Sequence, residues 1–505
     1  SFDITDVDDV ATGEEAVAKI ATKRYDIILC DYNLGPGKDG QQLLEEIKYR
    51  EFVNYSTIFM MITAENTMNM FLGAMEYQPD DYLMKPFTKG ALEKKIRDLI
   101  KKKENVEEID KAIEKKEFAR VIELCDQLIA NKVNNLSEVL KLKGEFLIKT
   151  ENYAEAESFY KKVLTMGNLP WALLGLGRIK FMTGHLHEAL EVFEDIISKN
   201  KNLMAAYDWL AKTQEKLGNL QEAQQILMEA VQISPRAILR QKALGNLAFA
   251  NKDLTVAEQA LKEAVKQGKH SCFKDPADHV TLAETLVESD QPAEGIAILN
   301  EAQKEFADVP DAVLPIAIAE SLAYSKMNRR EEAKSAARRA AAVLADPDVR
   351  IPRESGLNLA KAFLLAGDSE KGREIVRHLV QSNHEDQDFL GGVQDMFTEL
   401  RMEEKGREIV TAARSEVTRL NNQGVQLVRD GSLEKAIAYF KKAAQTLPEN
   451  KVINANTAQA IMLHMKKNGT NDSCLKDAME YINRVKSIDS SYKGISKLLN
   501  MYKEL

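Results

Sequence analysis

The chain has 505 residues and a net charge of −9; 44% of its residues are hydrophobic and 29% are charged. This length leaves room for several domains, and the negative charge argues against nucleic acid as the main partner, because the phosphate backbone would be repelled. The sequence has no run of 18 uninterrupted apolar residues, so we expect no membrane-spanning helix.

The first part of the chain, residues 1–103, alternates short β-rich runs with helical ones. Tyr25–Cys30 and Ser56–Thr63 are continuous apolar runs of the kind that form strands buried on both faces of a parallel sheet, and Asp81–Met84 predicts a further short strand. Helical spacing of apolar residues occurs at residues 13–22, 40–48 and 89–103. Strands that alternate with helices of this size predict βαβ units in a doubly wound α/β domain.

From residue 104 onward the sequence predicts helices joined by short turns, and a small residue recurs at regular intervals. This residue opens the second helix of each pair, and a large apolar residue usually follows four positions later. The small residues are Ala156, Ala189, Ala223, Ala257, Gly295, Ala333, Gly372, Gly406 and Ala436. The commonest step between them is 34 residues, which is the helix–turn–helix period of the tetratricopeptide repeat (TPR).

Two further patterns support this period. The heptapeptide EKGREIV occurs at Glu370–Val376 and again at Glu404–Val410. Glycine or alanine also recurs twelve positions before most of these markers, where a small side chain lets the two helices of a pair pack closely. Where the step between small residues exceeds 34, we expect extra residues in the loops near residues 270–275, 310 and 346–352. Residues 104–505 are therefore predicted to form an all-α TPR superhelical solenoid of about ten units.

Four features of residues 1–103, in order and at the expected intervals, resemble a CheY-like receiver domain, the phosphorylation switch of bacterial response regulators. Asp31 follows an apolar strand, as the phosphate-accepting aspartate of that family does. Thr63 ends the next strand, in the place of the switch threonine. Lys85-Pro86-Phe87 is similar to the lysine and the usually cis proline of the family, and Tyr82 lies where its switch aromatic is found. The resemblance implies an α/β flavodoxin-like receiver domain.

The resemblance also implies roles for these residues. Asp31 would act as the nucleophile that forms an aspartyl phosphate. Mg²⁺, held by Asp31 and by the backbone carbonyl of Asn33, and the ammonium group of Lys85 would neutralise the charge that develops on the phosphoryl group. The hydroxyl group of Thr63 would bind a phosphoryl oxygen, and Tyr82 would move with it.

The sequence departs from the receiver pattern at its start. A receiver domain begins with a strand that ends in the acidic pair for Mg²⁺, followed by a helix. Asp8-Asp9 lies only 22 residues before Asp31, about half the distance that the family needs, so we interpret this pair as surface residues. We therefore expect the receiver over residues 1–103 to be N-terminally incomplete, and the natural protein to have roughly 30–40 further residues, one βα unit. The Mg²⁺ site depends on the acidic pair of that segment.

These observations predict a phosphorylation-controlled signalling scaffold of a two-component phosphorelay, and no enzyme in the usual sense. A sensor histidine kinase or a phosphotransfer protein would phosphorylate Asp31. The concave face of the TPR array would bind a protein or peptide. The resemblance also admits a homodimer through the receiver.

Two other readings remain open. In the first, the protein is a constitutive TPR adaptor whose inactive receiver serves as a docking module. In the second, it is a regulator that binds nucleic acid; the net negative charge of the chain disfavours this reading. The four cysteines are widely spaced, without a CxxC pair, and favour reduced thiols in a cytoplasmic protein over disulfides or a zinc site.

Overall fold

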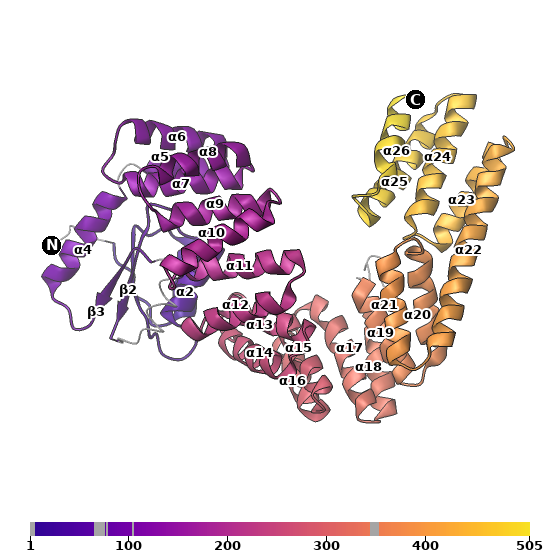
Figure 1. The fold of residues 1–505 in the computed structure, drawn as a ribbon, viewed down its shortest axis with the longest axis horizontal. Helices are drawn as coiled ribbons and strands as arrows, with labels where there is room; N and C mark the ends of the chain where they lie inside the picture. The colour runs from indigo at the N-terminus through magenta and orange to yellow at the C-terminus, as the bar shows by residue number, and fades with distance from the viewer. Residues whose placement is uncertain (1–5, 65–75, 77–78, 104–105, 344–352) are drawn as a thin grey trace. The chain divides into compact units, whose positions relative to one another are not determined.

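A parallel sheet of three strands lies near the N-terminal end of this computed structural model (Figure 1). The strands are β1 (Ile27–Asp31), β2 (Ile58–Thr63) and β3 (Asp81–Met84), in the order β1-β2-β3. Four residues of β2 are fully buried, in keeping with a strand whose two faces are both covered. The three predicted strands, two from apolar runs and the short one at Asp81–Met84, are therefore confirmed, in parallel pairing.

Helices cover both faces of this sheet. On one face, α1 (Gly13–Thr22) and α2 (Gly40–Tyr49) pack through residues such as Ile20, Leu44 and Ile47 against β1 and β2. On the other face, α4 (Lys89–Lys102) packs Ile96 and Leu99 against β2 and β3. Two local signals start these helices: Thr12 caps α1, and Asp39 and Gln42 form a reciprocal capping box on α2. The result is the three-layer α/β arrangement that the sequence predicts.

The structure describes residues 6–64, 76, 79–103, 106–343 and 353–505. The insertion expected at residues 346–352 lies outside them. The chain divides into two compact units, Ser1–Ser289 and Asp290–Leu505.

In the first unit, the sheet is followed by helices joined by short turns. These are α5 (Glu107–Glu114), α6 (Phe118–Ala130), α7 (Leu136–Lys149), α8 (Tyr153–Leu164), α9 (Pro170–Met182), α10 (Leu186–Lys199), α11 (Met204–Leu217), α12 (Leu220–Ile233), α13 (Ile238–Ala250), α14 (Leu254–Gly268) and α15 (Pro276–Glu288). The described residues between α5 and α15 include no strand. This confirms the all-helical array that the 34-residue period predicts.

Close approach between helices depends on glycines that face aromatic rings. A Cβ atom at Gly144 in α7 would lie 2.4 Å from the Tyr160 hydroxyl in α8, and one at Gly175 in α9 would lie 2.3 Å from the same ring. Gly177 in α9 faces Phe193 in α10 in the same way, at 2.5 Å. Real Cβ atoms do not come this close, so larger residues here would push the helices apart. The small and large residues of the repeat therefore touch, as the sequence predicts.

The second unit continues the helical array. Its helices are α16 (Pro292–Glu305), α17 (Pro310–Lys326), α18 (Arg330–Val343), α19 (Arg353–Leu365), α20 (Ser369–Ser382), α21 (Gln387–Glu399), α22 (Glu403–Arg429), α23 (Leu433–Thr446), α24 (Lys451–Asn468), α25 (Asp472–Ile488) and α26 (Gly494–Lys503).

One junction in this unit differs from the expected helix–turn–helix pattern. The repeat spacing predicts a turn between the helix that contains Gly406 and the next helix, which contains Gly424, but α22 runs through both as a single helix of 27 residues. The segment TAARSEVTRL at residues 411–420 contains no glycine or proline that would end a helix. The repeat step that spans this junction, from Gly406 to Ala436, is 30 residues, which is shorter than the common step of 34.

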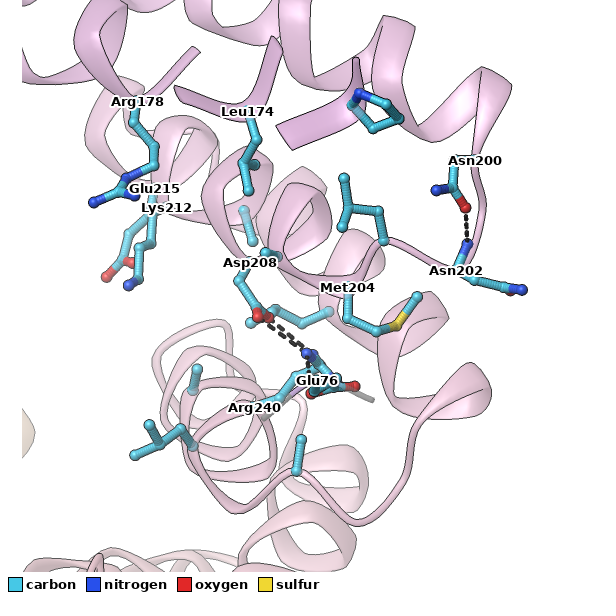
Figure 2. Close-up of a pocket in the computed structure, with 18 of the residues that line it drawn as sticks. Glu76, Leu174, Arg178, Asn200, Asn202, Met204, Asp208, Lys212, Glu215 and Arg240 are labelled. Atoms are coloured by element: carbon cyan, nitrogen blue, oxygen red, sulfur yellow. Dashed lines mark hydrogen bonds and ion pairs between the residues drawn. The ribbon is translucent and has the colours of Figure 1, made fainter. Parts of the chain in front are cut away.

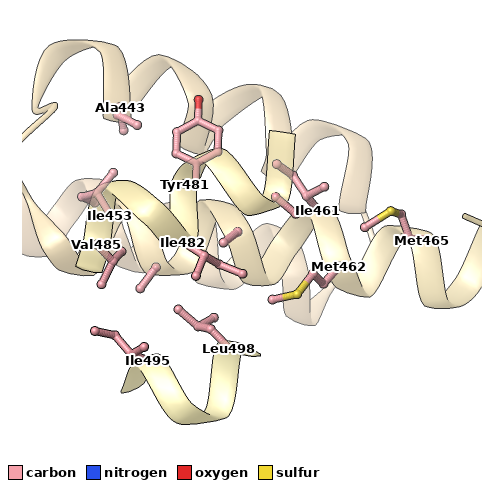
Figure 3. Close-up of a cluster of buried hydrophobic side chains, with 14 residues drawn as sticks. Ala443, Ile453, Ile461, Met462, Met465, Tyr481, Ile482, Val485, Ile495 and Leu498 are labelled. Carbon is pink, nitrogen blue, oxygen red and sulfur yellow. The ribbon is translucent and has the colours of Figure 1, made fainter. Parts of the chain in front are cut away.

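The C-terminal helices close around a large apolar cluster, shown in Figure 3. Ile453 and Met462 of α24, Ile482 of α25, and Ile495 and Leu498 of α26 are all buried in it. The short helix α26 therefore covers apolar side chains of α24 and α25 that would otherwise face water, which is the role of a capping helix in a repeat array.

The glycine contacts make a stability prediction that can be tested within the second unit. A Cβ atom at Gly424 would lie 2.3 Å from the Phe440 ring, whereas Gly391 in α21 has no atom within 4 Å of that position. Gly424→Ala should destabilise the protein by about 1–3 kcal/mol through overpacking. Gly391→Ala should stabilise it by about 0.5–1 kcal/mol through helix propensity. Urea unfolding followed by circular dichroism measures both, and equal effects of the two substitutions would contradict the packing argument.

Candidate functional site

The parallel strands bring three of the predicted residues to one edge of the sheet. Asp31 ends β1, Thr63 ends β2, and Lys85 follows β3. Because the strands are parallel, their carboxyl ends meet at the edge where doubly wound sheets bind ligands. The backbone N–H of Lys85 donates to the carbonyl oxygen of Thr63 at 2.8 Å. This bond extends the hydrogen-bonded pairing of β3 with β2 by one residue beyond Met84. The peptide bond between Lys85 and Pro86 is cis.

Asp31 and Lys85 form an ion pair at this edge. The Lys85 ammonium group contacts Oδ2 of Asp31, and both side chains are partly exposed to solvent, at 43% and 37%. An exposed pair of this kind adds little to stability. Its chemical consequence is larger, because a cation is held beside the carboxylate where a phosphoryl group would add negative charge.

The other oxygen of Asp31 faces the loop that follows β1. Oδ1 accepts a hydrogen bond from the backbone N–H of Asn33 at 3.3 Å. The Asn33 side chain in turn accepts from the N–H of Gly35 at 3.1 Å, so its amide group is used within the loop. Gly35 and Gly37 both have positive φ angles, at 84° and 105°, which glycine adopts without strain.

Tyr82 lies inside the domain. It sits in β3 opposite Met61 of β2, and its hydroxyl group is buried. Burial, and then the neighbouring Tyr32, raise the pKa of Tyr82 above its usual value. Tyr32 directly follows Asp31, so the predicted switch aromatic and the residue after the predicted phosphate acceptor are close neighbours.

Receiver domains typically bind Mg²⁺, but the described residues do not by themselves form such a site. Among them, no group of three or more His, Cys, Asp or Glu side chains could hold a metal ion. The Asp31 carboxylate is the predicted acidic ligand at the strand edge, and it is paired with Lys85. One carboxylate and the predicted carbonyl of Asn33 are few protein ligands for a hard cation that prefers octahedral oxygen coordination.

Asp8 is engaged elsewhere. Its Oδ2 atom accepts hydrogen bonds from Lys23 Nζ at 2.8 Å and from the Tyr25 hydroxyl at 2.6 Å. The bond from Lys23, followed by that from Tyr25, lowers the pKa of the Asp8 carboxyl group to about 2. Asp8 and Asp9 are both exposed. These contacts agree with the interpretation of this pair as surface residues.

A second candidate site is a cavity of about 1470 Å³ in the array of the first unit. It is lined mostly by the first helices of successive repeats, α7, α9, α11 and α13. Glu76 of the N-terminal domain also lines it, beside Arg240 (Figure 2). Arg178, Lys212 and Glu215 gather on one side of it. Arg178 and Lys212 both make cation–π contacts with Trp209. The Arg178 guanidinium lies 5.5 Å and the Lys212 ammonium 5.0 Å from the centroid of its ring. The lining is therefore apolar with charged groups of both signs.

Arg240 joins the array to the N-terminal domain at this cavity. It is only 3% exposed, and its guanidinium donates to both carboxylate oxygens of Asp208 in α11, at 2.8 and 3.0 Å. It also donates to both oxygens of Glu76, at 3.1 Å each (Figure 2). The planar fork of arginine suits two bidentate carboxylates. The two carboxylates keep Arg240 charged and raise its pKa against the effect of burial.

Sequence reasoning missed the array residues that contact the N-terminal domain, above all Arg240 and Arg236. Arg240 bonds Glu76 across 164 residues, and Arg236 bonds Tyr32 across 204 residues. A contact over such a distance leaves no local pattern. The available signal was weak: one arginine two residues before α13 and another in its first turn.

Removal of the buried guanidinium should weaken the first unit. Arg240→Met leaves the carboxylates of Asp208 and Glu76 without their cation, so we expect a loss on the order of 3 kcal/mol. Arg120→Met is the matched control, because Arg120 pairs with Glu123 on an exposed helix surface of the same unit and should cost about 0–1 kcal/mol. Urea unfolding compares them, and equal losses would show that the buried network does not stabilise the unit.

Two families of known proteins match parts of the chain. Residues 1–97 match the family model of the response regulator receiver domain, and residues 138–166 and 205–236 match that of the tetratricopeptide repeat. The transcriptional regulatory protein CiaR of Streptococcus pneumoniae is 34% identical over 100 residues, which are 20% of this chain and 43% of that protein. The transcriptional regulatory protein ResD of Bacillus subtilis is 29% identical over 96 residues, which are 19% of this chain and 38% of that protein.

The chain thus spans less than half the length of these curated relatives. Among solved structures, the C-terminal part of a TPR repeat-containing protein from Cytophaga hutchinsonii is 13% identical, with a TM-score of 0.39. That match covers 48% of this chain and 95% of the other. Within the part of the chain that the structure describes, no helix is long and apolar enough to cross a membrane.

Proposed function

We propose that this chain, which carries a response regulator receiver domain followed by TPR repeats, is a phosphorylation-controlled signalling scaffold. Asp31 accepts a phosphoryl group from a histidine kinase or a phosphotransfer protein, and the array binds a protein partner. The observation that carries this proposal is the ion pair between Asp31 and Lys85 at the carboxyl edge of the sheet, beside Thr63. Receiver and TPR folds are generally not catalytic, so the output is a binding event.

The proposed transfer uses groups of this chain. A carboxylate oxygen of Asp31 attacks the phosphorus atom of a phosphohistidine, a P–O bond forms, and the P–N bond breaks. The leaving nitrogen keeps the electron pair of that bond. The Lys85 ammonium offsets the charge on the phosphoryl oxygens, and the Thr63 hydroxyl donates a hydrogen bond to one of them.

The array supplies the surface for a partner. The cavity along α7, α9, α11 and α13 has apolar walls and charged groups, which suits an extended peptide or a helix. Stacked TPR pairs present such surfaces without chemistry of their own.

The constitutive adaptor, with the receiver as an inactive docking module, is the alternative. The two functions differ in whether Asp31 can be modified.

Phosphorylation of Asp31 can be tested with acetyl phosphate and Mg²⁺ as the phosphoryl donor mixture. We expect the intact protein to gain the mass of one phosphoryl group, which hydroxylamine removes because an acyl phosphate is reactive toward nucleophiles. Asp31→Asn should abolish this gain while leaving the circular dichroism spectrum unchanged. An unmodified wild-type protein would support the adaptor instead.

Lys85 should affect the rate of this reaction more than the fold. Lys85→Met removes the cation beside Asp31, so we expect phosphorylation to slow by roughly 10²-fold. Lys95→Met is the matched control, since Lys95 pairs with Asp81 at 2.6 Å on the α4 side of the same domain. The initial rate of mass gain measures both, and an equal rate for Lys85→Met and the wild type would exclude Lys85 from the site.

A further inference from the structure

A polar contact in the second unit joins the two sides of the long helix α22. Asn450, the residue that caps α24, is fully buried. Its Nδ2 atom donates to the carbonyl oxygen of Gln381 in the last turn of α20 at 2.6 Å, and lies 3.2 Å from Nδ1 of His384 in the loop between α20 and α21. Along the chain, α22 lies between these residues, and Asn450 is 69 residues from Gln381. We call this contact the α22 clasp.

The capping bond of α24 fixes how the amide group of Asn450 faces the imidazole. Its Oδ1 atom accepts a hydrogen bond from the backbone N–H of Ile453 at 2.9 Å. The NH2 group therefore points toward Gln381 and His384, and this group can only donate. One of its protons is bound by the Gln381 carbonyl, so the other is available to His384. Nδ1 of His384 consequently accepts, and in the closed clasp it carries no proton.

A proton on Nδ1 of His384 is incompatible with this arrangement. In the imidazolium form both ring nitrogens are donors. The N–H of Nδ1 would then face an N–H of Asn450. The nearby carbonyl oxygen of Gln381 could accept it, but this oxygen is already bound by Asn450. His384 therefore takes up a proton only if a hydrogen bond of the clasp breaks.

The surroundings of His384 also oppose a positive charge. Burial is the main cause that lowers its pKa below the ordinary value of 6.5. Two cations on the helices packed against this loop act in the same direction, Arg414 of α22 and Lys451 of α24, whereas Glu385 on the loop itself acts against them. Lys451 is in turn paired with Asp489 at 2.7 Å. His384 is therefore neutral at pH 7 while the clasp is closed.

Two further polar side chains keep the clasp weak. Asn454 donates from Nδ2 to the carbonyl oxygens of Asn450 and Pro448, at 2.8 and 2.9 Å, but its buried Oδ1 atom has no hydrogen-bond partner among the described residues. Within the same part of the chain, the buried hydroxyl group of Ser382, next to Gln381, has none either. A buried polar atom without a partner is destabilising, and water satisfies it once the contact opens. The loss of one more hydrogen bond can therefore open the clasp.

We propose that His384 and Asn450 form a pH-sensitive clasp across α22, which is closed while His384 is neutral and opens when Nδ1 takes up a proton. The closed state binds the proton less tightly than the open state, so acid favours opening. The stabilisation is fully present above about pH 6.5, the ordinary pKa of histidine, and decreases as the pH falls toward the lower pKa of the closed state. Opening frees the start of α24 from the end of α20, so acid changes how the repeats on the two sides of α22 are held together.

Hydrogen exchange of the full chain, followed by peptide mass spectrometry, measures opening at residues 447–456. The comparison is His384→Asn, because an asparagine oxygen can accept from Asn450 and does not titrate. At pH 7.5 we expect the two proteins to exchange at similar rates in this segment. At pH 5.5, one unit below the ordinary pKa, we expect the wild type to exchange about tenfold faster. Both proteins are compared at the same pH, so the intrinsic pH dependence of exchange cancels.

The matched control is His464→Asn. Nδ1 of His464 lies 3.0 Å from Nδ2 of Asn468, four residues further along the chain, so it makes the same kind of contact within one stretch at the end of α24. Protonation there breaks no contact across α22. The control should therefore exchange like the wild type at residues 447–456 at both pH values.

Asn450→Asp tests the direction of the hydrogen bond. A carboxylate can cap α24 through one oxygen, and its other oxygen can accept from a protonated Nδ1. We expect the pKa of His384, measured by NMR from its ring Cε1 signal and assigned with His384→Asn, to lie below 6.5 in the wild type and above 6.5 in this variant.

Three results would each contradict the clasp. They are equal exchange of the wild type and His384→Asn at pH 5.5, a pKa of His384 at or above 6.5 in the wild type, and a pKa that stays below 6.5 in Asn450→Asp. The measurements need no phosphoryl donor and do not involve Asp31. A failure of the clasp is therefore distinct from a failure of the proposed function.

Discussion

The helical array depends on how closely neighbouring helices can approach one another. The ring of Tyr160 lies against Gly144 in its own helix pair and against Gly175 in the next, at distances that leave no room for a Cβ atom. One ring thus determines the spacing both within a pair and between pairs. Within their own helix pairs, Phe193 lies as close to Gly177 and Phe440 as close to Gly424. Because each repeat is placed by its neighbour, the positions of surface residues further along the unit follow from these contacts.

In the receiver, the corresponding constraint is the parallel direction of the strands. Parallel pairing places all carboxyl ends at one edge, so Asp31, Thr63 and Lys85 meet there although Asp31 and Lys85 are 54 residues apart in the chain. The geometry also explains why Lys85 is held firmly. Its backbone continues the pairing of β3 with β2, while its side chain reaches across to β1. A cation placed in this way needs no rearrangement when negative charge develops beside it.

The contact between receiver and array includes several buried charged side chains. It buries Lys38, Glu46, Asp110 and Arg240. Lys38, Asp110 and Arg240 each bind a group on the other side of the contact, and Glu46 pairs with Lys38 within the receiver. Such charges are costly to bury and are stable only in a matched geometry. A contact of this type is specific without being strongly adhesive.

Much of the fold follows from local patterns in the sequence. Apolar runs of strand length mark β1, β2 and β3, and the recurrence of small residues marks the repeats, because both depend on which side chains can be buried at a fixed interval. The sequence also places Asp31 and Thr63 at strand ends and Lys85 after β3. It does not show that α22 continues where a turn is expected, since the repeat spacing and the helix propensity of that segment disagree.

What only the tertiary structure decided is which surfaces meet. Arg236 and Tyr32 are 204 residues apart, and Arg240 and Glu76 are 164 residues apart. Their pairing depends on the summed positions of several stacked repeats, which no local pattern encodes. The sequence by itself determined the elements and the chemistry at the end of each strand. The fold decided that the residue next to Asp31 is held by an arginine of the array, because only the packed repeats bring that arginine within hydrogen-bond distance of the receiver.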